Sequence, residues 1–230
     1  MTIAGLEKMS LVDFDGFVSA TVFTAGCNFK CGFCHNSPLV LHCDKLPLIP
    51  EEEILSYLQK RKGILDAVCV SGGEPTLQKD LALFLEKIKK LGYKIKLDTN
   101  GTNPELIKTL YAQGLCDYFA MDIKNDKDNY AKIIGFDKFD TAKVEKSVEY
   151  FLSGNAPYEF RTTLINEYHL KENIIAIGKW IKDANKYFLQ KFKIGENCIS
   201  QNLSEVPIER AKEYQAILKE TIEKVSLRGY

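Results

Sequence analysis

The 230-residue sequence lacks any long hydrophobic run, and no stretch approaches the roughly 18 consecutive apolar residues of a membrane-spanning helix. It also lacks a net charge, because 31 Lys and Arg residues balance 31 Asp and Glu residues. With neither a basic nor an acidic field, the net charge argues neither for nor against a nucleic-acid partner. We expect a soluble protein, with neither a membrane nor nucleic acid as a partner.

Linkers and repeats are also missing. No low-complexity segment, repeat array or Pro/Gly/Ser-rich stretch divides the chain. Apolar residues make up 45% of the sequence and charged residues 27%, which is typical of an ordinary globular protein. The length suffices for one sizeable core but is short for a complete eight-unit barrel. The composition thus predicts a single domain over residues 1–230.

Disulfides are not expected, although the chain has seven cysteines. The count is odd, and the opening residues MTIAGLEKMS lack the basic and apolar regions of a secretory signal, so we expect a reducing cytoplasm. Cys69 and Cys116 lie in or beside apolar runs and are predicted core residues, whereas Cys43 and Cys198 lie in predicted loops. These four do not group as a second metal cluster would require.

Strand and helix patterns alternate along the chain. They predict strands at 17–24, 64–70, 94–98, 118–123, 158–164 and 187–192, and helices at 51–58, 80–91, 104–113, 142–153, 171–184 and 208–225. Residues 1–16 are interpreted as a lead-in, and the apolar stripe of the last helix as core packing, with binding of a partner as the alternative. About six βα units predict an α/β fold, a partial (β/α)6 barrel with a parallel sheet and outer helices. Ligands of such folds gather at the carboxyl ends of the strands.

Three cysteines follow the first predicted strand with the spacing C-x3-C-x2-C: Cys27, Cys31 and Cys34. Gly26 and Gly32 permit the tight turns that would bring the thiols together. Three thiolates would leave one iron of a 4Fe-4S cluster open to a further ligand. The same triplet could instead bind zinc, with His42 or Cys43 as the fourth ligand. That alternative is a zinc-stabilised binding module without catalysis.

The second predicted strand runs into a glycine pair and an acid, in the order Gly72, Gly73, Glu74, Pro75 and Thr76. Two glycines let the backbone approach a ligand closely, and the carboxylate of Glu74 can accept hydrogen bonds from an ammonium group. Taken alone, the segment could also be an ordinary turn from a strand to a helix.

Charged residues mark three later strands. Asp98 and Thr99 end the third, Asp122 and Lys124 the fourth, and Arg161 alternates with apolar neighbours on the fifth. A carboxylate ligand beside two aspartates would be repelled unless a cation or a lysine intervened. The arginine can bind ribose or carboxylate oxygens, or form a plain ion pair. The aspartates could alternatively cap the helices that follow.

The cysteine triplet followed by GGEP resembles the signature of the radical S-adenosylmethionine (radical SAM) superfamily. The resemblance implies that the triplet holds one 4Fe-4S cluster, whose open iron binds the amino and carboxylate groups of the methionine moiety of S-adenosylmethionine. It further implies that Gly72, Gly73 and Glu74 hold the amino group and that Phe33 lies near the adenine. His35 and Asn36 complete the CHN that follows the triplet in one branch of the superfamily.

LDTNG, MDIK and the lead-in SLVDFDGFVSATVFTAGC are similar to that branch, the activating enzymes of glycyl-radical proteins. The nearest resemblance is to activating proteins of anaerobic ribonucleoside-triphosphate reductase, with similarity to pyruvate formate-lyase activating enzyme. It implies a monovalent cation near Asp98, Thr99 and Asp122, beside the methionine carboxylate, with Lys124 assisting that carboxylate and Arg161 at the position of an arginine in the activators. The turn at residues 14–16 departs from the aromatic-Pro-Gly of relatives.

The resemblance implies a cytoplasmic, oxygen-sensitive oxidoreductase with no catalytic side chain beyond the cluster. A flavodoxin- or ferredoxin-type donor would supply one electron, and a 5'-deoxyadenosyl radical would take hydrogen from a glycine of a partner, anaerobic ribonucleotide reductase. An alternative within the superfamily is a small-molecule or peptide substrate. His169 has no defensible partner pattern and is expected to be solvated or locally bonded.

Overall fold

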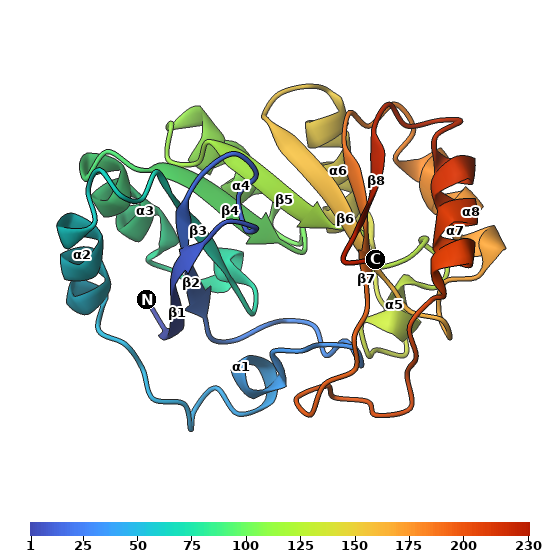
Figure 1. Ribbon diagram of the computed structural model, residues 1–230, viewed down its shortest axis with the longest axis horizontal. Coiled ribbons are helices and arrows are strands. Elements are labelled where there is room, and N and C mark those ends of the chain that lie inside the picture. Colours follow the sequence, from blue (N-terminus) through green and yellow to red (C-terminus); the bar gives the residue numbers. More distant parts are fainter. The chain divides into compact units, whose positions relative to one another are not determined.

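The computed structural model describes residues 1–230, in which strands and helices alternate (Figure 1). The strands are β1 (Ile3–Ser10), β2 (Ser19–Thr24), β3 (Ala67–Gly72), β4 (Lys94–Thr99), β5 (Tyr118–Asp122), β6 (Tyr158–Leu164), β7 (Tyr187–Lys191) and β8 (Val225–Arg228). The helices are α1 (Ser37–Leu41), α2 (Glu51–Lys60), the 3-10 turn η1 (Pro75–Leu77), α3 (Leu81–Lys90), α4 (Pro104–Ala112), α5 (Tyr130–Ile133), α6 (Ala142–Leu152), α7 (Lys171–Trp180) and α8 (Ile208–Leu218). The strands follow in chain order in an open, mostly parallel sheet, which confirms the predicted α/β class.

The chain forms two compact units, each built from two stretches of sequence. Unit 1 comprises Met1–Asn28 and Pro38–Ala120, and unit 2 comprises Phe29–Ser37 and Met121–Tyr230. The cysteine triplet is divided between them, with Cys27 in unit 1 and the other two cysteines in unit 2. That residues 1–230 form one domain stays a prediction.

Unit 1 is organised by the parallel strands β2, β3 and β4. Thr24 pairs with Gly72 and Val70 with Leu97, so the carboxyl ends of the three strands lie at one edge. Helices α2 and α3 bury the apolar side chains Ile54, Leu58, Leu81, Phe84, Leu85 and Ile88 in the core. Three glutamates occupy the first turn of α2 and three lysines the last turn of α3, as the helix dipole favours.

Unit 2 contains the parallel strands β6, β7 and β8 together with α7 and α8, which lie side by side (Figure 1). Gly178 of α7 faces α8, and a β-carbon there would lie 3.0 Å from Leu218 Cδ2, so the glycine allows the close packing of the two helices. None of the helices in the chain has the length and apolar character that a bilayer-spanning segment requires.

Two sequence-based predictions were wrong at the ends of the chain. Residues 1–16 are not an irregular lead-in, because residues 3–10 form β1, antiparallel to β2. The last helix ends at Leu218, and Val225–Arg228 form β8, parallel to β7. Both strands depend on hydrogen bonds to a neighbouring strand, β1 to the next strand in the chain and β8 to β7, and this pairing overrides local periodicity. Within α8 the stripe does pack in the core, since Ala211, Tyr214 and Leu218 are buried.

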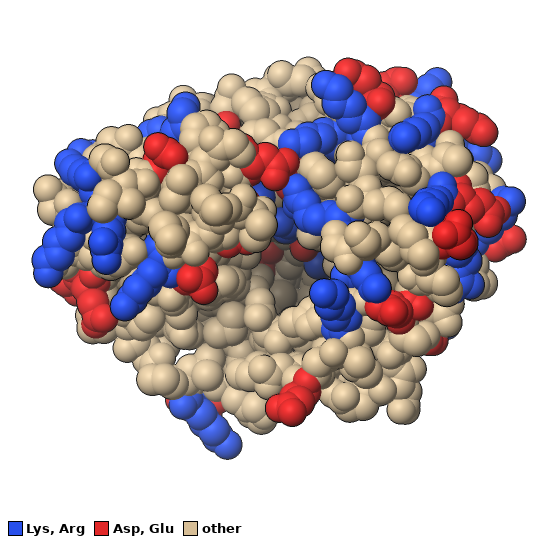
Figure 2. Space-filling model, in the orientation of Figure 1, with Lys and Arg blue, Asp and Glu red and all other residues tan.

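Surface charge is mixed. On the face of the molecule that Figure 2 shows, lysine and arginine side chains are interspersed with aspartate and glutamate side chains. This agrees with the equal numbers of acidic and basic residues in the sequence.

Candidate functional site

The glycine pair at the end of β3 lies directly against the start of the cysteine loop. A β-carbon on Gly73 would lie 2.1 Å from the carbonyl oxygen of Gly26, and one on Gly72, whose φ is +114°, would lie 2.4 Å from Thr24 backbone atoms. The amide of Glu74 donates to the Gly26 carbonyl at 2.9 Å. Only glycine fits at both positions, so this backbone holds the residue preceding Cys27.

Glu74 is buried, and its carboxylate accepts hydrogen bonds from η1 and from the end of β4. The donors are the amide and hydroxyl of Thr76 at 3.1 and 2.5 Å, the hydroxyl of Thr99 at 2.8 Å and the amide of Asn100 at 2.6 Å. Burial raises the pKa of Glu74, and these donors oppose that shift. Glu74 therefore joins two strand ends, and its carboxylate also caps η1. Its contact with an ammonium group stays a prediction.

A polar network anchors the amino end of the cysteine loop. Asn28, next to Cys27, donates to the Thr102 hydroxyl at 2.9 Å, and Asn100 donates to the side-chain oxygen of Asn28 at 2.8 Å. Thr102 in turn donates to Asn100 at 2.7 Å. Sequence analysis missed these three residues, although LDTNGT places two of them at a strand end, where ligands gather.

Asp98 lies in unit 1 beside a lysine that sequence analysis also missed. Its Oδ2 accepts from the hydroxyl of Ser71 at 3.0 Å, and its Oδ1 lies 3.6 Å from Nζ of Lys96. Lys96 precedes Asp98 by two residues on β4, so both side chains are on the same face of the strand. The lysine could have been noticed as a charge within an apolar strand pattern. Asp98 is not the cap of α4, because Asn103 fills that role.

In unit 2, Asp122 is held between two cations. Arg161 Nε donates to Oδ1 and Lys124 Nζ to Oδ2, both at 2.9 Å. Burial alone would raise the pKa of Asp122, but the two positive charges lower it to about 2. Asp122 is therefore ionised, and Arg161 forms the ion pair that sequence analysis had left as one alternative.

Lys124 also faces the cysteine loop of unit 2. Its Nζ lies 5.6 Å from the ring centroid of Phe33, a cation–π contact. Burial would lower the pKa of Lys124, but the charges of Asp122 and Cys31 raise it. Burial raises the pKa of Cys34, and the backbone amide of Asn36 and the charge of Lys124 oppose that rise. The positive charge of Lys124 thus works against the effect of burial on Cys34 and toward its thiolate, the form that binds metal.

The segment between β7 and α8 packs against the same loop. The amide of Ser200 donates to the Gly32 carbonyl at 2.8 Å, and a β-carbon on Gly32 would lie 2.7 Å from the hydroxyl oxygen of Ser200. Cys198 is buried, with its Sγ 3.9 Å from Nδ1 of His35, whose pKa is lowered by burial. The predicted loop position of Cys198 carried no signal of this contact with the cysteine motif.

His169 is fully buried, so the expectation of a solvated side chain was wrong and that of a locally bonded one is confirmed. Its Nδ1 accepts from the amide of Ile165 at 2.9 Å, and its Nε2 lies 2.9 Å from the carbonyl oxygen of Lys124. The ring therefore carries its proton on Nε2 and donates to that carbonyl. It fixes the backbone of Lys124.

Because His169 is buried and neutral, it makes stability depend on pH. Burial lowers the pKa of His169 from 6.5 to about 4, so the unfolded chain binds a proton more readily than the folded one. The stabilisation is present above the unfolded pKa and is lost as pH falls, and it should amount to about 2 kcal/mol between about pH 7 and about pH 5.

The measurement is the free energy of unfolding in urea at both pH values. His169→Asn should be less stable at neutral pH and should lose less stability on acidification. The matched control is His42→Asn, which removes an exposed histidine and should keep the wild-type pH dependence. Equal pH dependence in wild type and His169→Asn would contradict this account.

None of the seven cysteines in residues 1–230 forms a disulfide; Cys31 is buried, and Cys27 and Cys34 are partly exposed. In residues 1–230, no group of three or more His, Cys, Asp or Glu side chains is arranged as a metal-ion site. The assignment of the three cysteines to an iron–sulfur cluster therefore rests on the sequence motif and on the family to which the chain is assigned below. The donor set fits an iron–sulfur cluster, because thiolates are its usual ligands and Lys124 supplies positive charge beside two of them.

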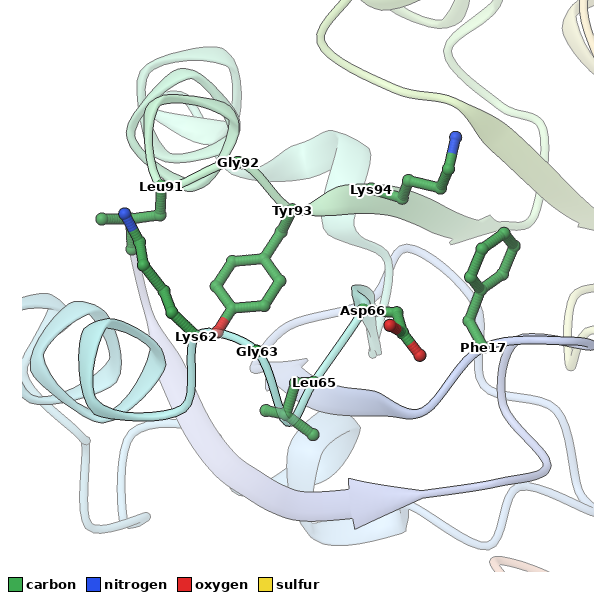
Figure 3. Close-up of a pocket in the computed structure, with 9 residues that line it drawn as sticks. All are labelled: Phe17, Lys62, Gly63, Leu65, Asp66, Leu91, Gly92, Tyr93 and Lys94. Atoms are coloured by element: carbon green, nitrogen blue, oxygen red, sulfur yellow. The ribbon is translucent and has the colours of Figure 1, made fainter.

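A separate pocket in unit 1, of about 390 Å³, does not coincide with these residues (Figure 3). Asp66, Tyr93 and Lys94 line it at the amino ends of β3 and β4. Two of its polar groups are used within the fold, since Tyr93 donates to the Leu58 carbonyl at 2.7 Å and Asp66 accepts from the amide of Val18 at 3.0 Å. The candidate site lies at the carboxyl ends of these strands, where such folds place their chemistry.

The model of the radical SAM superfamily matches residues 21–176. This range contains the three cysteines, the GGEP turn and the strand-end charges described above, and it covers more than half of the chain. The chain therefore belongs to the radical SAM superfamily and is a radical SAM enzyme. Membership implies a 4Fe-4S cluster and S-adenosylmethionine as cofactors. Because the chain is an enzyme of this superfamily, the alternative of a zinc-stabilised module without catalysis is set aside.

One relative matches nearly the whole chain. It is a Methanocaldococcus jannaschii protein named as a candidate glycyl-radical enzyme activating enzyme, 31% identical over 98% of this chain and 95% of its own length. A domain of pyruvate-formate lyase-activating enzyme from Bacteroides vulgatus has a TM-score of 0.56 and 16% identity, covering 71% of this chain and 99% of that domain. Streptococcus suis SuiB bound to S-adenosylmethionine has a TM-score of 0.65 and 18% identity, over 88% of this chain and 48% of SuiB. The two structures support the fold.

Proposed function

We propose that this enzyme activates a glycyl-radical enzyme, with anaerobic ribonucleotide reductase as its partner. The observation that carries the proposal is the relative named as a candidate activating enzyme, which aligns over 98% of this chain. The motifs LDTNG and MDIK, which resemble those of activating enzymes, support the same proposal.

The cluster, once bound, would pass one electron to S-adenosylmethionine, so that its C5'–S bond breaks to give methionine and a 5'-deoxyadenosyl radical. That radical would take a hydrogen atom from the partner's glycine, giving 5'-deoxyadenosine and a glycyl radical. A flavodoxin- or ferredoxin-type protein is the proposed source of the electron. The chain's own contribution would be to bind, to orient and to exclude water.

Cys27, Cys31 and Cys34 are the proposed cluster ligands. The backbone of Gly72 and Gly73 would contact the methionine amino group, supported by Glu74.

Lys124 would bind the methionine carboxylate. Asp122 would hold the Lys124 side chain in place, and Arg161 would in turn hold Asp122. Phe33 and the segment His35–Asn36 would lie beside the adenine and the cluster. The resemblance implied a monovalent cation near Asp98, Thr99 and Asp122, which nothing here tests; the charges around these aspartates favour the different arrangement proposed below.

An anaerobic experiment tests the proposal in two stages. The protein is reconstituted with iron and sulfide, reduced, and supplied with S-adenosylmethionine; we expect brown colour, absorption near ~400 nm, and equal amounts of 5'-deoxyadenosine and methionine. Anaerobic ribonucleotide reductase labelled with α-deuterated glycine is then added. We expect a glycyl radical in the electron paramagnetic resonance spectrum and one deuterium in the 5'-deoxyadenosine.

Each stage can fail separately. If 5'-deoxyadenosine and methionine do not form in the first stage, the cleavage chemistry is contradicted. Cleavage without a glycyl radical or deuterium transfer would contradict this partner, and a small molecule or peptide would then be the substrate to seek.

A further inference from the structure

Unit 1 contains an ion pair between a buried lysine and a partly exposed aspartate, which no motif of the sequence indicated. The side chain of Lys96 is 4% exposed, and its Nζ lies 3.6 Å from Oδ1 of Asp98. The same nitrogen donates to the backbone carbonyl of Asp13 at 2.5 Å, and the carboxylate of Asp13 accepts from the hydroxyl of Thr21 at 2.6 Å. A lysine side chain is rarely buried unless it is paired, and the contacts with Asp98 and with the Asp13 carbonyl account for the burial of Lys96.

Lys96 reaches a residue proposed to lie beside the bound cofactor. Asp98 Oδ2 accepts a hydrogen bond from the Ser71 hydroxyl at 3.0 Å, and Oδ1 is the oxygen that faces the ammonium group of Lys96. Thr99, the neighbour of Asp98, points to the other face of β4, where its hydroxyl donates to Glu74 at 2.8 Å. The hydroxyl of Thr99 is thus engaged away from Asp98, whereas the ammonium of Lys96 lies beside it.

The second aspartate is neutralised in the same manner. Asp122 in unit 2 accepts from Lys124 and from Arg161, both at 2.9 Å. Each aspartate therefore has a cationic side chain of its own unit within 4 Å. A ligand carboxylate near either aspartate, taken in its own unit, would meet a charge that is already compensated, without a cation from solution.

We propose that Lys96 serves as a tethered cation that compensates Asp98, so that S-adenosylmethionine binds without a monovalent ion from solution. The inference rests on the cofactor-binding part of the proposed function and is independent of the identity of the partner. Lys96 acts through Asp98 and is a positioning residue.

The test measures affinity for S-adenosylmethionine on anaerobically reconstituted protein in choline, sodium and potassium chloride at equal ionic strength. Wild type should bind equally in all three salts. Lys96→Met should bind at least about tenfold more weakly in choline, because Asp98, which is 16% exposed, would lose the positive charge of Lys96 and would repel the cofactor carboxylate more strongly. Sodium or potassium should restore part of this loss.

A double variant separates charge from packing. Lys96→Met combined with Asp98→Asn removes both charges, and its affinity in choline should recover to within about threefold of wild type. Lys96→Arg, which keeps the charge, should behave like wild type. If Lys96→Met alone does not fold, the double variant and Lys96→Arg still carry the test.

Two results would overturn the inference. One is a wild-type protein that itself needs sodium or potassium to bind S-adenosylmethionine. The other is a Lys96→Met variant that keeps wild-type affinity in choline, or a double variant whose affinity in choline does not recover. A wild type that binds S-adenosylmethionine in none of the three salts would overturn both this inference and the proposed function. Wild type that binds only with sodium or potassium, yet cleaves the cofactor, would leave the proposed function intact.

Discussion

Cys31→Ala should abolish cluster assembly and the cleavage of S-adenosylmethionine. A thiolate ligand has no substitute in alanine, so we expect the rate of 5'-deoxyadenosine formation to fall by more than the 10–100-fold that changes outside the ligand set cause. The charge of Lys124 would also lose the Cys31 thiolate as a neighbour. The measurements are iron content after reconstitution, absorption near ~400 nm and 5'-deoxyadenosine formed per protein.

The matched control is Cys43→Ala, which removes an exposed cysteine outside the triplet. It should assemble the cluster and turn over like wild type. If Cys43 were a zinc ligand, which is the alternative that the cysteine spacing allows, this variant would lose metal as well. Wild-type turnover in Cys31→Ala would contradict the cluster assignment, and circular dichroism shows whether the variant is folded.

Gly73→Ala should have the second largest effect, for a steric reason. The new methyl group would lie 2.1 Å from the carbonyl oxygen and 2.7 Å from the carbonyl carbon of Gly26, so one backbone segment must move. Gly73 does not have a positive φ, so the cost comes from the collision and not from the backbone conformation. We expect a loss of about 1–3 kcal/mol in the free energy of unfolding.

The displacement should also weaken cofactor binding, because Gly26 precedes Cys27 and the amide of Glu74 donates to Gly26. We expect affinity for S-adenosylmethionine to fall at least about tenfold, as a shift of about 1.4 kcal/mol would cause. Urea unfolding and equilibrium binding measure the two effects separately.

Gly195→Ala is the control for this substitution. Gly195 also has no positive φ, and the nearest atom to its added methyl would be Nδ1 of His35 at 3.7 Å, an ordinary contact. Its free energy of unfolding should stay within about 0.5 kcal/mol of wild type. Gly73→Ala protein that binds the cofactor as wild type does would show that the turn tolerates the shift.

Local pattern predicted the elements that are strongly periodic or strongly marked. Helix α4, which begins at Pro104 after the cap Asn103, and strand β6 were found at or near their observed bounds. The strands β1 and β8 were missed, because pairing with β2 and β7 decides their structure and that pairing is absent from a local window.

The candidate site divides in the same way. Motif spacing was enough to select the cysteines, the GGEP turn and the aspartates at the strand ends, because these residues are close in sequence to the strands that carry them. Contacts between remote segments were not predictable, since Lys96 meets Asp13 across 83 positions and Cys198 meets His35 across 163. Nothing in a short window records such contacts.

The sequence by itself determined the class of this protein, because three cysteines at fixed spacing and GGEP after a strand specify the radical SAM chemistry through local covalent order. Tertiary structure alone decided the charge state and orientation of the site residues. Asp122 stays ionised because Lys124 and Arg161 converge on it, and Glu74 is buried among donors from η1 and from the end of β4. Those effects depend on distance and burial, which arise only when remote segments pack together.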